Sequence, residues 1–294
     1  MSDKTSTFPE TELILTDKNT VYHIDLRGEQ IADDVIVVGD QDRVSLIASY
    51  FSKKEHSSRH REFVSETGWF NGKRITVLST GIGTDNIDIV VNELDAAVNI
   101  NPERRELNPN LRRLNIVRLG TSGSLQEDIP VDGLVVSRYG LGLDGLLNFY
   151  GDFEKIAEKE ISDAFINHLN WSKGLPFPYC VKSDETLFEK FAEGNYSGIT
   201  ATAPGFYGPQ GRTLRLHPFN ENLNELLGTF RFEKERITNF EMETSALYGL
   251  GKMLNHRCVT ICVIIGNRVR KEFTKDYQKS VKRLIETSLE RLTS

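Results

Sequence analysis

The feature that most constrains the fold is a set of short apolar runs rich in β-branched residues. They occupy positions 35–38, 75–78, 115–119, 134–136 and 258–265. A strand with one face in water alternates apolar and polar residues, whereas a strand covered on both faces is apolar almost throughout. The runs therefore predict strands buried in a central sheet.

Helical periodicity appears between and after these runs. Within 85–98, five apolar residues from Ile87 to Val98 form one stripe, and 240–254 and 277–292 show the same spacing. Strands that alternate with amphipathic helices are typical of the α/β class. No internal repeat or linker divides the chain, so we expect one domain over 1–294 with a polar N-terminal arm at 1–20. The charged segment 101–113 is expected to be a surface loop.

Composition narrows the choice of ligand and compartment. The 36 Lys+Arg and 42 Asp+Glu residues give a net charge of −6, which argues against the basic surface that nucleic acid requires. No apolar run is long enough to cross a membrane. The 3 cysteines leave an odd thiol in any disulfide scheme and favour a reducing compartment. We expect a cytoplasmic protein that holds a small ligand with a few focused arginines.

Glycine-bearing loops follow three of the predicted strands, at 39–43, 79–85 and 118–123. Each alone could be an ordinary turn with a helix cap. Together they predict a ligand site, because α/β sheets bind ligands at the carboxyl ends of their strands and helix N-termini attract anions. Positions 140–145 also match the GxGxxG pattern, but no clear amphipathic helix follows, so a Rossmann oxidoreductase is the least favoured interpretation.

Segments along most of the chain resemble, in the same order, those of nucleoside phosphorylases of the uridine phosphorylase type. They are VVGDQDR at 37–43, RHREF at 59–63, LSTGIGTDN at 78–86, VRLGTSGSL at 117–125, FYGPQGR at 206–212, NFEMET at 239–244 and VIIGNR at 263–268. The resemblance implies an α/β fold whose central mixed, partly barrel-like sheet is flanked by helices. It also implies reversible phosphorolysis of uridine: phosphate attacks the anomeric carbon, uracil leaves, and ribose 1-phosphate forms. Phosphate is then a co-substrate, and no metal or organic cofactor is needed.

The resemblance assigns site residues to three subsites. The phosphate subsite takes Gly39, Arg43, Arg61, Arg118 and Thr121; the ribose subsite takes His23, Met242, Glu243 and Thr121; the base subsite takes Phe206, Gln210, Arg212 and Gly123. Guanidinium forks suit a phosphate dianion, and a carboxylate accepts hydrogen bonds from two ribose hydroxyls. An amide and a guanidinium can read the uracil edge and stabilise the leaving anion.

Taken without the resemblance, several of these residues have ordinary explanations. Arg61 lies in a charged run typical of a solvated surface, Met242 could be core, and Glu243 could be a helix N-terminal acid. The segment 205–211 could be a surface turn rich in glycine and proline. The shared order of the segments favours the functional interpretation.

The resemblance further implies a homodimer, or a hexamer built of dimers, in which Arg61 and His23 reach the neighbouring subunit's site. Some relatives hold a monovalent cation near the positions of Glu62 and Ile82. The remaining histidines lack metal-ligand spacing and are expected at the surface; they are His56, His60, His168, His217 and His256.

Three alternatives stay open. Purine phosphorylases of this superfamily carry an aspartate after the last long core strand, where 264–269 holds no acid, so purine is disfavoured. A nucleosidase would use water and would not need Arg43, Arg61 and Arg118. Retention of every one of these residues argues against a non-catalytic nucleoside-binding protein on the same scaffold, and a turnover assay distinguishes it.

Overall fold

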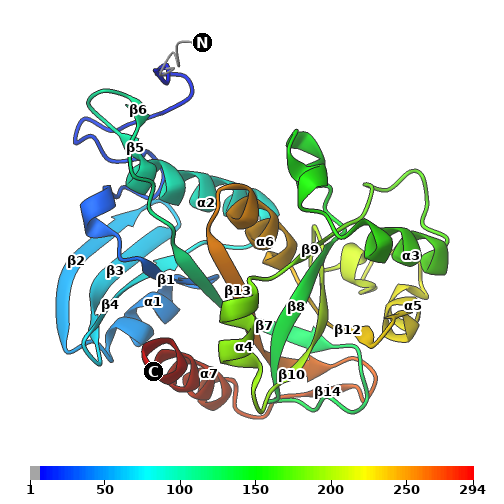
Figure 1. Ribbon diagram of the computed structural model, residues 1–294. Helices are drawn as coiled ribbons and strands as arrows, with labels where there is room; N and C mark the ends of the chain where they lie inside the picture. Colours follow the sequence, from blue (N-terminus) through cyan, green and yellow to red (C-terminus); the bar gives the residue numbers. More distant parts are fainter. Residues whose placement is uncertain (1–6) are drawn as a thin grey trace.

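The computed structural model describes residues 7–294 and has the mixed α/β architecture that the sequence predicts (Figure 1). The strands are Asp34–Val38 (β1), Lys53–His60 (β2), Phe63–Phe70 (β3), Lys73–Ser79 (β4), Ile100–Asn101 (β5), Glu106–Leu107 (β6), Asn115–Ser124 (β7), Leu134–Gly142 (β8), Tyr179–Lys182 (β9), Tyr196–Thr202 (β10), Arg231–Phe232 (β11), Glu235–Glu241 (β12), Arg257–Asn267 (β13) and Glu272–Phe273 (β14).

The α-helices of the same residues are Gln41–Ala48 (α1), Thr84–Asn99 (α2), Lys159–Leu169 (α3), Glu185–Ala192 (α4), Leu223–Thr229 (α5), Thr244–Met253 (α6) and Tyr277–Thr293 (α7). Short 3-10 turns occupy Gly28–Gln30, Leu146–Phe149, Phe153–Lys155 and Gly208–Gln210. No helix within 7–294 has the length and hydropathy of a membrane span.

Within residues 7–294, 12 strands form one mixed sheet in the order β11-β12-β10-β8-β13-β7-β1-β4-β3-β2, with β9 beside β8 and β14 beside β13. The strands β4, β1, β7 and β13 run parallel. The sheet also closes on itself, because β7 pairs with β12 through Ser124↔Asn239 and Gly123↔Phe240. The ring of β12, β10, β8, β13 and β7 confirms the predicted barrel-like character.

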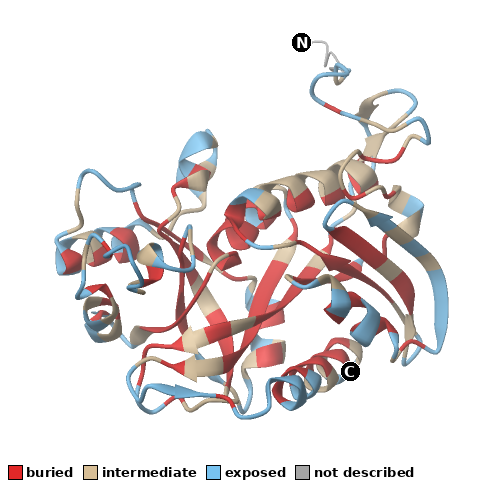
Figure 2. Cartoon of the chain, turned by 180° about the vertical axis from the view of Figure 1, so that it is seen from behind, coloured by how far each residue is buried: buried red, intermediate tan, exposed pale blue. Residues whose placement is uncertain are grey.

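Helices cover both faces of the sheet. Because successive strand residues point to opposite faces, β1 gives Ile36 and Val38 to a layer with α1, α4 and α7, and it gives Val35 and Val37 to a layer with α2 and α6. Figure 2 shows the buried residues gathered on the central strands and on the helix sides that face them. This two-sided burial explains why β1 is apolar throughout.

Two predicted segments differ from the structure. The predicted helix over 240–254 is wrong at its start. Phe240 and Glu241 end strand β12, and the helix α6 begins only at Thr244. Pairing of these residues with β10 and β7 holds them extended. The segment 101–113 includes part of a small hairpin, β5 with β6, and Arg112 in it donates to the backbone of Gly28 and Ile31.

His256 is buried, contrary to the expectation of a surface position. It is 4 % exposed, and its Nδ1 accepts a hydrogen bond from the backbone N–H of Leu114. Its Nε2 lies 3.2 Å from a carboxylate oxygen of Asp95 on α2. The residue is buried because it leads into the central strand β13.

The glycines at 140–145 serve packing. A side chain at Gly140 would come within 2.8 Å of the backbone of Ser245, at the start of α6. The segment is followed by a 3-10 turn rather than an α-helix, so it does not form a dinucleotide-binding unit. At the N-terminal end, 7–20 runs beside the β5–β6 hairpin, where Phe8 donates to the carbonyl of Arg105 (Figure 1). Residues 1–6 of the expected arm lie outside the described residues.

Candidate active site

A cavity of about 1180 Å³ opens at the carboxyl ends of β1, β4 and β7. Every sequence-predicted site residue lines it except Arg61 and His23; the lining set includes Gly39, Arg43, Arg118, Thr121, Gly123, Phe206, Gln210, Arg212, Met242 and Glu243. A second cavity of about 780 Å³ has mainly apolar walls and shares Arg212 with the first. It contains none of the phosphate or ribose candidates.

The first glycine loop presents Arg43 to the cavity. Asp40 caps α1 by accepting from the backbone N–H of Asp42, so the helix starts directly after the loop. Arg43, in the first turn of α1, is 7 % exposed. Its Nη1 donates to the Leu119 carbonyl at 3.1 Å and its Nη2 donates to the Tyr277 hydroxyl at 2.7 Å. The guanidinium is thus held between β7 and α7.

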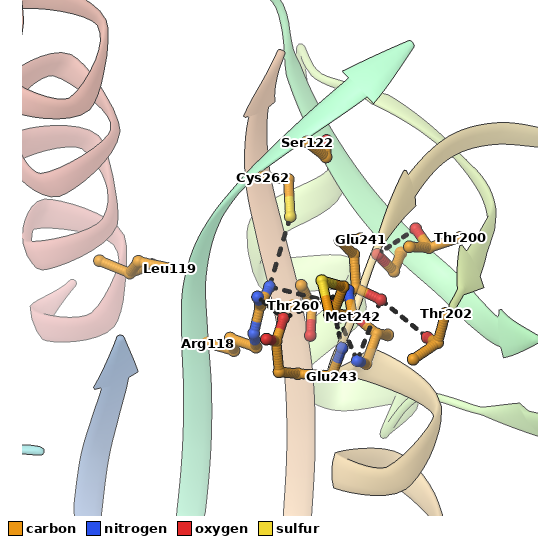
Figure 3. Close-up of polar contacts among 12 residues, drawn as sticks. Arg118, Leu119, Ser122, Thr200, Thr202, Glu241, Met242, Glu243, Thr260 and Cys262 are labelled. Carbon is orange, nitrogen blue, oxygen red and sulfur yellow. Dashed lines mark hydrogen bonds and ion pairs between the residues drawn. The ribbon is translucent and has the colours of Figure 1, made fainter. Parts of the chain in front are cut away.

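The third expected loop, 118–123, is part of strand β7, because pairing with β13 continues through these residues. Arg118 on this strand lies between two carboxylates (Figure 3). It forms ion pairs with Glu243 and with Glu241, the latter at 3.2 Å, and all three side chains are buried. Burial by itself lowers the pKa of Arg118, but the charges of Glu243 and Glu241 outweigh it and raise the pKa above its usual value. The guanidinium is therefore permanently charged.

Glu241 was not among the sequence-predicted site residues, although it lies within the NFEMET segment. Its carboxylate accepts from the Thr202 hydroxyl at 2.7 Å and from the backbone N–H groups of Glu243 and Thr244 (Figure 3). Burial raises the pKa of Glu241, and Arg118 opposes that shift. Glu241 thereby fixes both the arginine and the backbone that carries Glu243.

Glu243 faces the cavity with part of its hydrogen-bonding capacity in use. One oxygen accepts from the backbone N–H of Gly83 at 2.8 Å, just before α2, and the other accepts from Arg118. A carboxylate has about four acceptor positions, so Glu243 retains capacity for further donors such as hydroxyls. Met242 lies beside it and also lines the cavity.

The loop after β10 forms the opposite end of the cavity. Gln210 is 4 % exposed, and its amide oxygen accepts from Arg212 at 2.6 Å. The Arg212 guanidinium lies over the ring of Phe206, 3.6 Å from its centre. This stacking orders an arginine in a loop whose composition alone suggests a simple turn.

Arg268 is a second residue that the site prediction omitted. It lies in the VIIGNR segment, lines the cavity and donates to the backbone carbonyl of Gln210. Burial and the neighbouring charge of Arg268 lower the pKa of Arg212 to about 10. Burial also lowers the pKa of Arg268. Two partly desolvated guanidinium groups at one end of a cavity favour a ligand on which negative charge develops.

Arg61 and His23 lie away from the cavity in this chain. Arg61 is at the turn between β2 and β3, where its φ is 53°, and its side chain is exposed and contacts the Tyr22 hydroxyl. The His23 ring lies 2.6 Å from Glu93 on α2. The structure groups these two residues around Tyr22 and does not bring them to the other site residues.

The proposed cation positions lie at the edge of the cavity. Glu62 and Ile82 both line it, and Ile82 is 67 % exposed. Within residues 7–294, no group of three or more histidine, cysteine or acidic side chains is arranged to hold a metal.

Comparison with known proteins gives concordant matches. Residues 33–293 match the family model described as the phosphorylase superfamily. A uridine phosphorylase of Thermococcus kodakarensis is 28% identical over 92% of this chain and 86% of the relative. A DeoD-type purine nucleoside phosphorylase of Buchnera aphidicola is 25% identical over 91% of this chain and 97% of the relative. A solved Trypanosoma brucei nucleoside phosphorylase, described as showing uridine phosphorylase activity, has a TM-score of 0.86 at 30% identity, covering 96% of this chain and 99% of that chain.

Proposed function

The chain belongs to the phosphorylase superfamily, and from this premise we propose that it catalyses the reversible phosphorolysis of uridine to uracil and ribose 1-phosphate. It resembles both uridine and purine enzymes in sequence, so the base subsite decides between them. In this function, residues 1–294 form one catalytic domain, and phosphate is the co-substrate. We further propose that the enzyme needs no organic cofactor and works in the cytoplasm.

The observation that carries the proposal is the arrangement of Gln210, Arg212 and Arg268. Uracil presents a carbonyl, an imide N–H and a second carbonyl along one edge, and an amide with a guanidinium complements that edge. When the glycosidic bond breaks, its electron pair moves to the uracil nitrogen. The two guanidinium groups beside Gln210 would stabilise this charge, and Phe206 would stack on the ring.

The other end of the cavity supports the remaining roles. We assign phosphate to Gly39, Arg43, Arg118 and Thr121, and ribose to Met242 and Glu243. A phosphate oxygen forms the new bond to the anomeric carbon on the side away from uracil, while uracil leaves with the electron pair and is protonated from water. The residues of this chain orient the two reactants and stabilise charge at both ends.

The carboxyl end of β13 argues against purine as the preferred base. Asn267 is 2 % exposed there, and its amide donates to the carbonyls of Gln126 and Ile129. Its oxygen accepts from the backbone N–H groups of Val269 and Arg270. Residues 264–269 contain no aspartate or glutamate, and these hydrogen bonds hold the Asn267 amide against the backbone, so this segment offers no acid to a purine ring.

We also propose that the working form is a homodimer, or a hexamer of dimers, because Arg61 and His23 lie outside the cavity of their own chain. In an assembly with shared sites, the exposed β2–β3 turn would place Arg61 at the partner's phosphate and His23 would approach its ribose. A monovalent cation between subunits near Glu62 and Ile82 is compatible with this arrangement.

The decisive experiment follows uracil release from uridine with and without phosphate, and repeats it with inosine. The proposal predicts phosphate-dependent release from uridine and much slower cleavage of inosine. Release without phosphate would assign a nucleosidase, preference for inosine would assign a purine enzyme, and binding without turnover would assign a non-catalytic protein.

A further inference from the structure

We propose that Tyr277, at the start of the C-terminal helix α7, is a positioning residue that fixes the Arg43 guanidinium for phosphate. The inference rests on the proposed function, because it deepens the role given there to Arg43. The Tyr277 hydroxyl accepts from Arg43 Nη2 at 2.7 Å, although the two residues are 234 positions apart in the sequence.

Together with a second hydrogen bond, the contact with Tyr277 holds the Arg43 guanidinium at both of its ends. Arg43 Nη1 donates to the backbone carbonyl of Leu119, which lies between Arg118 and Thr121 on β7. One end of the fork is therefore fixed to the strand that carries Arg118 and Thr121, and Tyr277 fixes the other end. A guanidinium has five N–H donors, so the two contacts leave others for an anion. Arginine has many rotamers, and holding it in place before binding reduces the entropy lost when phosphate binds.

Tyr277 can act as a support because the start of α7 is itself anchored. Asp276 caps the helix by accepting from the backbone N–H of Lys279. One turn later, the Ser280 hydroxyl donates to Asp132, which also accepts from Thr274 at 2.6 Å. These contacts fix the backbone on both sides of Tyr277. Tyr277 is 39 % exposed and belongs to none of the buried apolar clusters.

The chain offers a matched control for removal of this hydroxyl. Tyr50, just after α1, donates its hydroxyl to Glu286 on α7 at 3.0 Å. Tyr50→Phe and Tyr277→Phe each delete one phenolic hydroxyl that links α7 to the α1 region. Of the two tyrosines, Tyr277 is the one that contacts Arg43.

The test is steady-state kinetics of the full-length wild type and both variants with phosphate and uridine varied in turn. We expect Tyr277→Phe to raise the KM for phosphate by about tenfold, the loss typical of one hydrogen bond to a charged group. At saturating phosphate, kcat and the KM for uridine should stay within about twofold of wild type, as should all constants of Tyr50→Phe. In an Arg43→Lys background, Tyr277→Phe should have little further effect, because the coupled partner is gone.

Three results would overturn the inference: an unchanged KM for phosphate in Tyr277→Phe, an equal rise in Tyr50→Phe, or full additivity with Arg43→Lys. Failure of the proposed function is seen separately. Wild-type uracil release that needs no phosphate removes the phosphorylase assignment, whereas phosphate-dependent wild type with normal Tyr277→Phe removes the positioning role alone.

Discussion

Arg118 and Glu243 form a buried ion pair that joins the proposed phosphate and ribose subsites (Figure 3). The same Glu243 carboxylate accepts from Gly83, which precedes α2. A residue assigned to one substrate is therefore bonded directly to a residue assigned to the other. Substitutions here should affect the handling of both substrates, unlike substitutions at the base loop.

Glu243→Gln should impair both subsites. The amide keeps the shape of the side chain but loses the charge that balances Arg118, leaving Glu241 as the remaining carboxylate beside the guanidinium. We expect kcat/KM for uridine to fall by about a hundredfold or more, with a changed KM for phosphate as well. Glu290→Gln, on the exposed side of α7, is the control and should match wild type. A variant that lost uridine binding but kept wild-type phosphate kinetics would contradict the coupling.

Asp144 should give the stability of the protein a specific pH dependence. Burial raises the pKa of its carboxyl, despite hydrogen bonds from Leu146 and Tyr179 that lower it. The folded state therefore favours the protonated acid, and the resulting stability is complete below the unfolded pKa of about 4. It is lost as the pH rises through the folded pKa. The free energy of unfolding of wild type relative to Asp144→Asn should thus decrease from pH 4 to pH 7, as measured with urea.

An exposed aspartate provides the comparison for this experiment. Asp152 lies in a nearby surface turn, where its partner is Lys155. Asp152→Asn should show no comparable trend over the same pH interval. A constant difference between wild type and Asp144→Asn would mean that the carboxyl titrates alike in the folded and unfolded states.

Most of the central fold could be predicted because burial requires recognisable patterns of apolar residues in the sequence. β1 is an apolar run buried on both faces, and α2 carries an apolar stripe from Ile87 to Val98. The edge strand β2, with the sequence KKEHSSRH, is mostly exposed and has no apolar pattern to detect. Glu241 falls within 240–254, where the spacing of apolar residues from Met242 to Leu254 predicts a helix, whereas strand pairing with β10 determines its conformation.

The cavity residues that could be predicted from the sequence are those in recognisable segments. Arg43, Arg118 and Gln210 lie in recognisable sequence segments, and the structure gathers them around one cavity. Tyr277 has no motif, because its contact with Arg43 depends on where the last helix lies against the first. Contacts between distant segments of this kind are visible only in the folded chain.

Mixed subunits test the proposed sharing of sites. Arg61→Ala and Arg118→Ala should each be nearly inactive, because each lacks a guanidinium assigned to phosphate. A mixed dimer contains one site with both arginines, since each chain supplies what the other's site lacks. Random exchange should restore roughly a quarter of wild-type activity in a twofold-symmetric dimer. No recovery, in subunits shown by mass to have exchanged, would place Arg61 outside the reaction.

Base recognition can be isolated at Gln210, because its backbone and side chain have separate partners. Arg268 donates to the Gln210 carbonyl, so Gln210→Ala keeps that contact and loses only the amide that faces Arg212. We expect kcat for uridine to fall by about a hundredfold, as for loss of one preorganised group. The KM for phosphate should change little, because Arg43 and Arg118 lie on other elements, α1 and β7.

The wild type should also distinguish uridine from cytidine through the same amide and guanidinium. Cytidine presents an amino group where uridine presents a carbonyl, and its ring nitrogen carries no hydrogen. A site built to hydrogen-bond these groups should reject cytidine by about 10⁴ in kcat/KM, and Gln210→Ala should lose much of that preference. Competition between the two nucleosides at fixed phosphate measures the ratio directly. Full uridine turnover by Gln210→Ala, or equal cleavage of both nucleosides by the wild type, would show that this loop does not read the base.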